Sequence, residues 1–399
     1  MWEIIRANQR KSVFLFIIMG LVLVVLGFIV GLAFSSDGSG GIIGIIIAFL
    51  VWGILTLVSV TSGSAIMLSA SNAKPITPDI HPQLYNVVEE MRIAAGLTNM
   101  PKIYIINTDA PNAFATGISP EKASIAVTAG LLARLNRDEL QGVVAHEMSH
   151  IYNRDVRFMT IAGVMMGTIV IISEIFLRGM FFSGGRGKKG GGQGQIIILI
   201  LAIVLAILAP IIAQLLYFSL SRKREYLADA SAVRFTRYPE GLASALEKIA
   251  NSDVDMPMAN KVTAPMYICN PLKKKGKKLS DLSSTHPPIS ERIRILRNMS
   301  GAGYGNYEQA YDSVKGKVSH IIPKSALTEE SALPFRQGLV NETAADVKTT
   351  ARTSGDIMMK VDNFAFITCD CGMKYKIPAE YKENQFHCTR CGKEHTIVR

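Results

Sequence analysis

The chain has 399 residues and a net charge of +11, with 49% hydrophobic and only 19% charged residues. Its mean hydropathy of +0.25 is high for a soluble protein, and its length allows two or three domains. The apolar residues are unevenly distributed, because Asp37 is the only charged residue between Lys11 and Lys74. This composition argues against a purely soluble chain and indicates that part of it lies in a membrane.

Four long apolar runs account for the excess of hydrophobic residues. They cover about residues 13–34, 42–68, 158–177 and 196–220. Each has roughly 20 residues or more, which at 1.5 Å per helical residue is enough to cross a hydrocarbon core of ~30 Å. A single run of this kind could be a buried core helix, but four in one chain predict a multi-pass membrane protein.

Basic residues near the ends of membrane spans predict which side of the membrane each loop faces. Arg6, Arg10 and Lys11 precede the first run, whereas the loop around Asp37 has no basic residue. We therefore expect a protein of the cell membrane whose N-terminus and soluble domain are cytoplasmic. The loop 178–195 is basic and has no acidic residue, so the second hairpin either crosses despite this charge or is only partly inserted.

The N-terminal hairpin (1–73) is followed by residues 74–157, which have the composition of a soluble region. Within them, Lys102–Asn107 and Ala123–Thr128 predict two short strands. The intervening segment Asn112–Gly117 has the sequence NAFATG and follows a proline. This context is consistent with a strand or turn at the edge of a sheet.

A helix is predicted to begin at Asn136, because Asn136 and Glu139 three residues later resemble a capping box. Apolar residues then recur at helical spacing and predict a buried stripe. The stripe consists of Leu140, Val143, Val144, Met148 and Ile151.

The same helix carries the motif HEMSH, which has the spacing of a metal site. His146 and His150 are one turn apart and about 40° from each other around the helix, so both imidazoles can reach one ion. Zinc suits nitrogen ligands. Glu147 lies beside the pair, where it can take a proton from an activated water and later pass one to a leaving amine. Two histidines also occur at this spacing on ordinary helices.

A catalytic zinc site needs a third protein ligand and leaves one position for water. Just after the fourth apolar run, Glu225 and Asp229 are four residues apart and share a helix face. Glu225 can be the third ligand, and Asp229 can accept a hydrogen bond from the free N–H of a ligating histidine. The alternative is a charged helix next to the membrane, in which Glu225 pairs with Arg222 or Arg224.

Four motifs, interleaved with the apolar runs, together resemble the HtpX-type membrane zinc metalloproteases, relatives of the CAAX prenyl endopeptidases within the gluzincins. The motifs are NAFATG (112–117), HEMSH (146–150), SRKREYLAD (221–229) and THPPISER (285–292). The resemblance covers roughly residues 1–300. It implies an α+β membrane protein with four hydrophobic helices and a mostly helical gluzincin-type protease domain that carries a small β-sheet.

The resemblance also implies roles for individual residues. The zinc ligands would be His146, His150 and Glu225, with Glu147 as the general base. The NAFATG segment would lie along the active-site cleft, where its backbone could pair with an extended substrate. The substrate-binding residues would then be Asn112, Ala113, Phe114 and Ala115.

Two further residues, His286 and Arg292, would lie close to the metal by the same resemblance. We expect His286 to stabilise the oxyanion and Arg292 to order that corner of the site. The alternative for His286 is a surface histidine before two prolines. The implied task is quality control, in which misfolded or damaged membrane proteins are cleaved from the cytoplasmic side.

The second hairpin (158–220) separates the first half of the soluble domain from a second half at 221–323, which looks helical and basic up to residue 300. Within it, Pro271–Lys278 is a lysine run, interpreted as a solvated loop or as a contact with anionic lipid. Residues 324–362 are polar and rich in small residues, which is typical of a linker with at most a short helix.

A small module with two cysteine pairs is predicted at 363–399. Cys369 and Cys371 are followed, after sixteen residues, by Cys388 and Cys391, and a glycine follows each pair. Two close pairs of thiolates predict a structural zinc site in a β module similar to a zinc ribbon. Two disulfides are the alternative, which a cytoplasmic location disfavours.

The first pair has the spacing C-x-C, whereas a zinc ribbon usually has C-x-x-C, so His387 or His395 could replace one thiolate. The module also departs from the usual HtpX pattern. It would bind substrate, a partner or nucleic acid, or would stabilise the tail. The remaining cysteine, Cys269, is interpreted as structural.

The sequence therefore predicts a membrane zinc endopeptidase with one catalytic and one structural zinc ion. Its partners would be polypeptides, expected to be membrane proteins, and the lipid bilayer, while the oligomeric state stays open. The alternatives are a zinc-containing scaffold or regulator without turnover and a prenyl-protein endopeptidase, for which four spans are few. Nucleic-acid binding is disfavoured, because residues 365–399 hold six basic and four acidic side chains, a weak electrostatic footprint.

Overall fold

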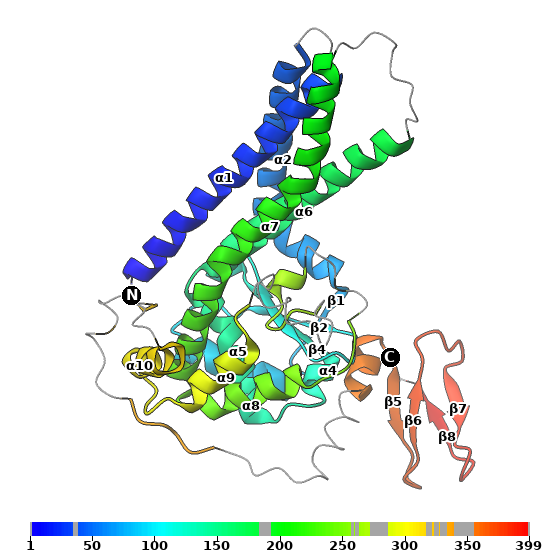
Figure 1. Cartoon of the computed structure of the whole chain (residues 1–399). Helices are drawn as coiled ribbons and strands as arrows, with labels where there is room; N and C mark the ends of the chain where they lie inside the picture. Colours follow the sequence, from blue (N-terminus) through cyan, green and yellow to red (C-terminus); the bar gives the residue numbers. More distant parts are fainter. Residues whose placement is uncertain are drawn as a thin grey trace.

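A bundle of long helices projects from a domain of helices and one sheet, and a small β module lies beside that domain (Figure 1). The computed structural model describes residues 2–34, 39–182, 193–256, 259, 263–271, 286–316, 321–322, 327, 333–338 and 355–397. The lysine run after Pro271, the middle of the loop 178–195 and most of the linker predicted at 324–362 lie outside these residues.

The bundle consists of four helices: α1 (Trp2–Phe34), α2 (Ser39–Ala70), α6 (Asp155–Phe182) and α7 (Gln193–Thr236). Within the described parts of the chain, these are the helices long and apolar enough to cross a membrane, as the four apolar runs predict. Helix α7 has 44 residues, about 66 Å at 1.5 Å per residue, or roughly twice the hydrocarbon core. One continuous helix therefore carries both the fourth apolar run and the residues that follow it in the soluble domain.

Glycines bring α1 and α2 into backbone contact. A Cβ atom added to Gly44 would lie 2.1 Å from the carbonyl oxygen of Gly27, and one added to Gly31 would lie 2.0 Å from that of Gly40. Small residues at helix crossings in membranes allow such close approach. The first hairpin is therefore held by packing that leaves no space for larger side chains.

The sheet has the strand order β1-β2-β4-β3. Its strands are β1 (Ala73–Pro75), β2 (Lys102–Ile106), β3 (Ala113–Thr116) and β4 (Ser124–Thr128). Strands β2 and β4 are parallel, and the other two pairs are antiparallel. This confirms the two predicted strands and places the NAFATG segment at a sheet edge.

Side chains alternate between the two faces of the sheet. One face supplies Ile105, Val127 and their neighbours to the main core, which also contains apolar residues of α3 (Pro82–Ala94) and α5 (Arg137–Tyr152). The other face supplies Phe114 and Ala126 to a smaller core with the end of α2. Helix α5 therefore packs directly behind the edge strand β3.

The predicted capping box starts α5. The Asn136 side chain accepts a hydrogen bond from the Glu139 N–H, and the Glu139 carboxylate accepts one from the Asn136 N–H, both at 2.9 Å. On its other sides α5 packs against α7 and α8 (Pro239–Ala250). The domain is completed by the short elements α4 (Ala129–Leu132), η1 (Pro120–Lys122) and η2 (Ala264–Met266), and by α9 (Ile289–Arg297) and α10 (Tyr304–Lys315).

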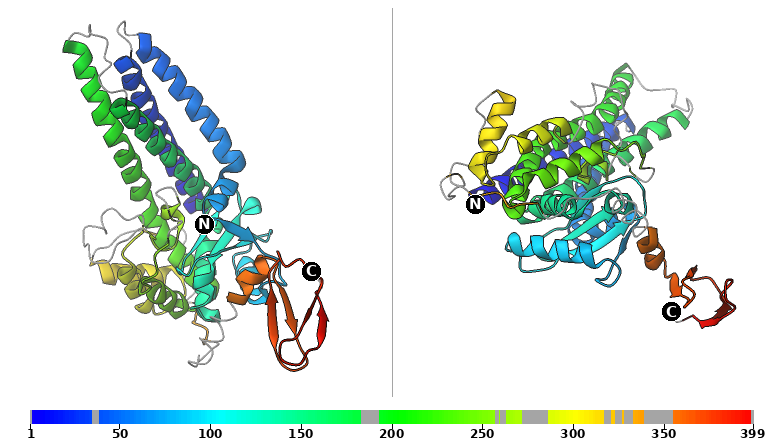
Figure 2. Two further views of the ribbon diagram at one scale, coloured as in Figure 1. Left: turned by 90° about the vertical axis from the view of Figure 1, so that its right-hand side faces the viewer. Right: turned by 90° about the horizontal axis from the view of Figure 1, so that it is seen from below.

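The C-terminal module is attached to the side of the domain away from the helix bundle (Figure 2). It contains the hairpins β5 (Ala365–Thr368)–β6 (Lys374–Ile377) and β7 (Gln385–His387)–β8 (Glu394–Thr396). Residues 355–361 form a helix before it. Ile357 and Met358 of this helix are buried in the main core, and Asp362 forms an ion pair with Lys74 of β1. The end of the predicted linker therefore packs on the domain.

Candidate active site

Three buried side chains from two helices face one point. Helix α5 presents His146 and His150, and α7 presents Glu225 between them. The Nε2 atoms of the histidines lie 3.5 and 3.4 Å from the Glu225 carboxylate oxygens. Ligand atoms at about 2.0–2.2 Å from a tetrahedral zinc ion would lie roughly 3.3–3.6 Å from one another. The three residues therefore fit the site that the sequence predicts.

Glu147 lies on the same helix and is only 2% exposed. Burial raises the pKa of its carboxyl group, because the charged form loses its water, while a hydrogen bond with the backbone of Ala115 opposes this effect. A raised pKa suits a group that must both accept and release a proton near neutral pH.

On the far side of the first histidine, Asp229 lies between His146 and Arg292. Its Oδ1 atom is 3.0 Å from Nδ1 of His146. The Arg292 guanidinium donates to both carboxylate oxygens of Asp229, at 2.9 and 2.7 Å. Burial by itself would raise the pKa of Asp229, but the positive charge of Arg292 outweighs it and holds that pKa below its ordinary value. Asp229 is therefore a buried carboxylate that faces Nδ1 of His146 as a hydrogen-bond acceptor.

A second carboxylate, which the sequence did not assign to the site, faces the other histidine. The Oδ2 atom of Asp155 lies 3.5 Å from Nδ1 of His150. Nε of Arg224 lies 3.8 Å from Asp155, and its guanidinium stacks 4.1 Å above the ring of Phe158. Each candidate histidine ligand thus has a carboxylate behind it, and an arginine behind the carboxylate. Two features of the sequence could have indicated this contact: Arg224 directly precedes Glu225, and Asp155 follows His150 by five residues.

His286 and Arg292 both come close to the third candidate ligand. Nε2 of His286 and Nη1 of Arg292 each lie 3.6 Å from Glu225 Oε2. His286 is buried, and this burial lowers the pKa of its imidazole to about 4. The ring is therefore neutral at physiological pH and retains one N–H donor.

The sequence profile of peptidase family M48 matches residues 78–300. The chain belongs to this family. It is 49% identical to an HtpX protease homologue of Dictyoglomus turgidum over 298 residues. This matched region covers 75% of this chain and 94% of the relative. A homologue of Listeria monocytogenes is 43% identical over 308 residues, which are 75% of this chain and 100% of that one.

These matches confirm the resemblance drawn from the motifs, and the chain is an HtpX-like membrane metalloprotease. About a quarter of it lies outside the matches to these M48 relatives. The crystal structure of S. mikatae Ste24p aligns over 74% of this chain and 67% of that chain, with 19% identity and a TM-score of 0.39, a likeness too low for a functional comparison.

Other segments of the same chain cover most of the outer edge of β3. Asn112 bonds to β4 through its carbonyl, so by alternation the backbones of Ala113 and Ala115 face outward. The Ile268 N–H donates to the Ala113 carbonyl at 2.9 Å. The Asn112 side chain donates to the Cys269 carbonyl at 2.8 Å and accepts from its N–H at 3.3 Å.

The same coverage continues at the far end of the strand. Thr160 of α6 donates its hydroxyl to the Gly117 carbonyl at 3.2 Å, and the Ala115 backbone bonds to Glu147. Phe114 points to the opposite face, where its ring packs edge-on against Tyr267 at 5.1 Å. In this conformation residues 268–269 occupy the position along Asn112 and Ala113 that an added strand would take.

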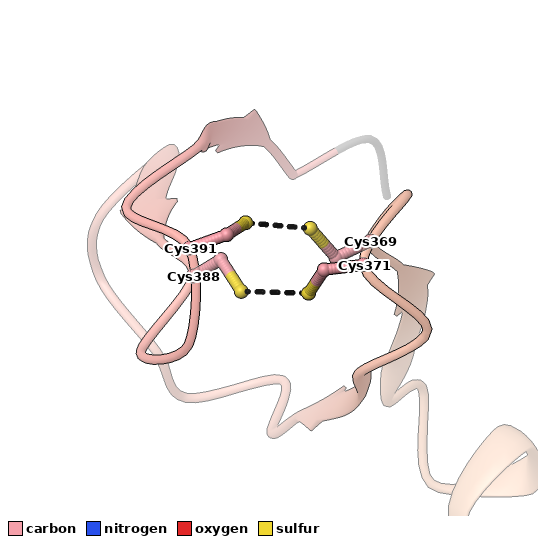
Figure 3. Close-up of side chains that lie close together, drawn as sticks. All are labelled: Cys369, Cys371, Cys388 and Cys391. Carbon is pink, nitrogen blue, oxygen red and sulfur yellow. Dashed lines mark hydrogen bonds between the residues drawn. The ribbon is translucent and has the colours of Figure 1, made fainter.

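The C-terminal module brings its four cysteines together (Figure 3). Two sulfur pairs, Cys369–Cys391 and Cys371–Cys388, lie 3.4 and 3.5 Å apart. A disulfide would need about 2.05 Å, whereas the edge of a tetrahedron of sulfurs around zinc is about 3.8 Å. The arrangement fits a metal ion and not two disulfides.

Groups around the thiolates support this fit. The Tyr375 hydroxyl donates to Sγ of Cys388 at 3.1 Å and lowers the pKa of that thiol to about 5. Gly372 and Gly392 follow the cysteine pairs with φ values of 84° and 73°, a conformation that glycine adopts readily. His395 stacks on the ring of Phe386, and the group that could hold a metal consists of the four cysteines.

Proposed function

We propose that this chain is a zinc-dependent endopeptidase that hydrolyses misfolded or damaged membrane proteins at the cytoplasmic face of the cell membrane. The observation that carries the proposal is the convergence of His146, His150 and Glu225 around one point, with Glu147 beside them. The site lies next to the end of the helix bundle that adjoins the peptidase domain, because α7 continues from its apolar run directly to Glu225. The basic residues before α1 favour the cytoplasmic side.

A zinc ion held by His146, His150 and Glu225 would polarise the substrate carbonyl and make a water molecule more acidic. The protein's own residues handle the protons. Glu147 accepts a proton from the attacking water and passes it to the leaving amine. Neutral His286, 3.6 Å from Glu225, donates its N–H toward the oxygen that becomes negative in the transition state.

Asp229 and Asp155 face the Nδ1 atoms of the two histidines, and the Nε2 atoms lie toward Glu225, where they would be available to a metal ion. Carboxylates in this position fix the orientation of the imidazole and increase its basicity. Arg292 donates a hydrogen bond to Asp229 at 2.7 Å, whereas Arg224 forms an ion pair with Asp155 at 3.8 Å. Arg292 would therefore act on a bound metal through Asp229 and is a positioning residue.

The substrate would bind as an extended strand along β3, at Asn112, Ala113, Phe114 and Ala115. Residues 268–269 already pair with the first two of these positions, so a substrate must displace this segment. A chain segment with free backbone N–H and C=O groups can replace those hydrogen bonds, whereas a folded segment cannot. This requirement favours unfolded substrates and accords with a role in quality control.

The four cysteines of the C-terminal module would hold a second, structural zinc ion. Four protein ligands leave no open position for substrate, so this ion would stabilise the module and take no part in hydrolysis.

Substitution of Glu147 by glutamine tests the proposed reaction. We expect the variant to keep its zinc while cleavage of an unfolded membrane protein falls by roughly 10²–10⁴-fold. In native membranes the variant should retain bound substrates that can be identified by mass spectrometry. Glu89→Gln is the matched control, because Glu89 is an exposed carboxylate on α3 and its loss should leave cleavage unchanged. Equal cleavage by Glu147→Gln and the native protein would contradict the mechanism.

A further inference from the structure

A cavity of about 610 Å³ lies where the helix bundle meets the peptidase domain. Its wall is mostly apolar and includes Phe16 and Met19 of α1, Val60 of α2, and Ile161 and Met165 of α6. None of these residues belongs to the catalytic site. The volume is in the range of small-molecule sites, about 300–1,000 Å³.

Two arginines line the cavity at the corner between α5 and α6. Arg154 and Arg157 are both exposed, and they are the charged residues of the lining, which contains no carboxylate. Among the residues that the structure describes, neither arginine forms an ion pair within 4.0 Å. Hydrogen bonds with Ser119 and with its own backbone lower the pKa of the exposed Glu121, and the charge of Arg154 adds to this effect. The cavity lining therefore presents two arginines that have no ion-pair partner within 4.0 Å among the described residues.

The depth of the cavity matches the boundary of the bilayer. The apolar windows of α1 and α6 begin at Phe16 and Asp155, so the arginines lie at the level of lipid headgroups and Met165 lies toward the hydrocarbon. Guanidinium groups bind phosphate through paired hydrogen bonds. A substrate helix, about 10 Å across, would need a groove that continues along the span.

We propose that this cavity binds an anionic phospholipid, with its phosphate between Arg154 and Arg157 and an acyl chain against the apolar wall. The lipid would hold the corner between α5 and α6. That corner carries Asp155, the residue that faces His150. A consequence for peptidase activity rests on the proposed function, but the binding itself does not.

Trp52 provides a local probe of the cavity. Its ring centroid lies 5.0 Å from that of Phe16, and its carbonyl accepts a hydrogen bond from Thr56, which lines the cavity. The chain has two tryptophans, so Trp2→Phe leaves Trp52 as the single fluorophore. The full-length protein with this substitution is placed in phosphatidylcholine nanodiscs that contain a few per cent of brominated phosphatidylglycerol or brominated phosphatidylcholine.

We expect the brominated phosphatidylglycerol to quench Trp52 more strongly at equal mole fraction. Because each arginine near an anionic headgroup contributes about 1 kcal/mol, the two together contribute about 2 kcal/mol, and R154Q/R157Q should reduce this preference by roughly thirtyfold. R294Q/R297Q removes the same charge from α9 in the soluble domain and should retain the preference. Unlabelled phosphatidylglycerol should reverse the quenching.

Three results would overturn the proposal. Equal quenching by the two lipids would show an apolar crevice without headgroup recognition. Unchanged preference in R154Q/R157Q, or its loss in R294Q/R297Q, would show a general surface attraction. Reversal by a single-span substrate fragment, without reversal by unlabelled phosphatidylglycerol, would assign the cavity to substrate. Since binding is read without peptide cleavage, an inactive protein would still report on the lipid site.

Discussion

Arg292 donates two hydrogen bonds to Asp229 inside the domain, where neither side chain is accessible to solvent. The residues are separated by 63 positions in the chain and come from α9 and α7. Their pairing compensates the charge that Asp229 needs in order to orient His146, 3.0 Å away. The structure therefore couples the candidate zinc site to the packing of α9.

Loss of the charge on Asp229 should weaken metal binding. Asparagine has the same shape but cannot accept the hydrogen bond from His146 as strongly, so we expect Asp229→Asn to reduce zinc affinity by roughly 10–100-fold. Titration against a competing chelator measures the change. Asp79→Asn is the control, because Asp79 is exposed before α3. Equal affinities in the two variants would show that Asp229 does not support a ligand.

Removal of Arg292 should destabilise the whole domain. Arg292→Met would leave Asp229 as a buried charge without its arginine, and breaking a buried ion pair in this way typically costs about 3–5 kcal/mol of unfolding free energy. The double variant D229N/R292M should recover part of this loss, since both charges are then absent. Thermal unfolding of the four proteins forms a complete cycle. Additive losses in the double variant would disprove the coupling.

Asp155 should act on His150 as Asp229 acts on His146. We expect Asp155→Asn to lower zinc affinity by about tenfold, while Asp362→Asn, which removes a carboxylate from the surface ion pair with Lys74, leaves it unchanged. Zinc content after dialysis against graded chelator distinguishes the two. A normal affinity in Asp155→Asn would mean that the 3.5 Å separation does not shorten into a supporting contact.

The glycine contact between α1 and α2 should tolerate no side chain. In Gly44→Ala the new Cβ would meet the Gly27 carbonyl at 2.1 Å, whereas Gly53 on the same helix has no atom within 4 Å of an added Cβ. We expect Gly44→Ala to lose about 1–3 kcal/mol of stability. Gly53→Ala should show no loss of stability from steric overlap. Unfolding in detergent micelles compares them directly. Similar stabilities would mean that the helices cross elsewhere.

The C-terminal module should depend on its metal. Cys391→Ser removes one of four ligands, so we expect zinc content to fall from about two ions per chain to about one and the module to lose its fold. Cys269→Ala, outside both candidate sites, should retain both ions. Metal analysis with proteolysis of the module checks each variant. A full zinc content in Cys391→Ser would require another ligand in its place.

Local patterns were enough to predict much of the chain. The length of the apolar runs, the capping box at Asn136, the spacing of His146 and His150, and the two cysteine pairs all act over a few residues. Glu225 was a candidate ligand from its position and its spacing with Asp229, and the resemblance to a known family also assigned it to the zinc site and NAFATG to the cleft, where a substrate role stays a prediction. The structure confirms the long apolar helices, the capping box and the approach of the four cysteines, because helix geometry and turn geometry relate residues a few positions apart.

Contacts between segments that are far apart in the chain could not be predicted from local sequence patterns. Ile268 and Cys269 cover the edge of β3 from more than 150 positions away, and Asp155 meets Arg224 across a membrane hairpin. The cavity at Arg154 likewise forms where residues of four helices, α1, α2, α5 and α6, and the segment 118–120 converge.

By itself, then, the sequence determined which residues are able to bind metal and which segments are able to enter a membrane, because both follow from side-chain chemistry and short-range periodicity. The tertiary structure decided which carboxylate faces which histidine, how the outer edge of β3 is covered and where the cavity beside Arg154 and Arg157 forms. Those features depend on how rigid helices pack, and packing is a property of the whole chain.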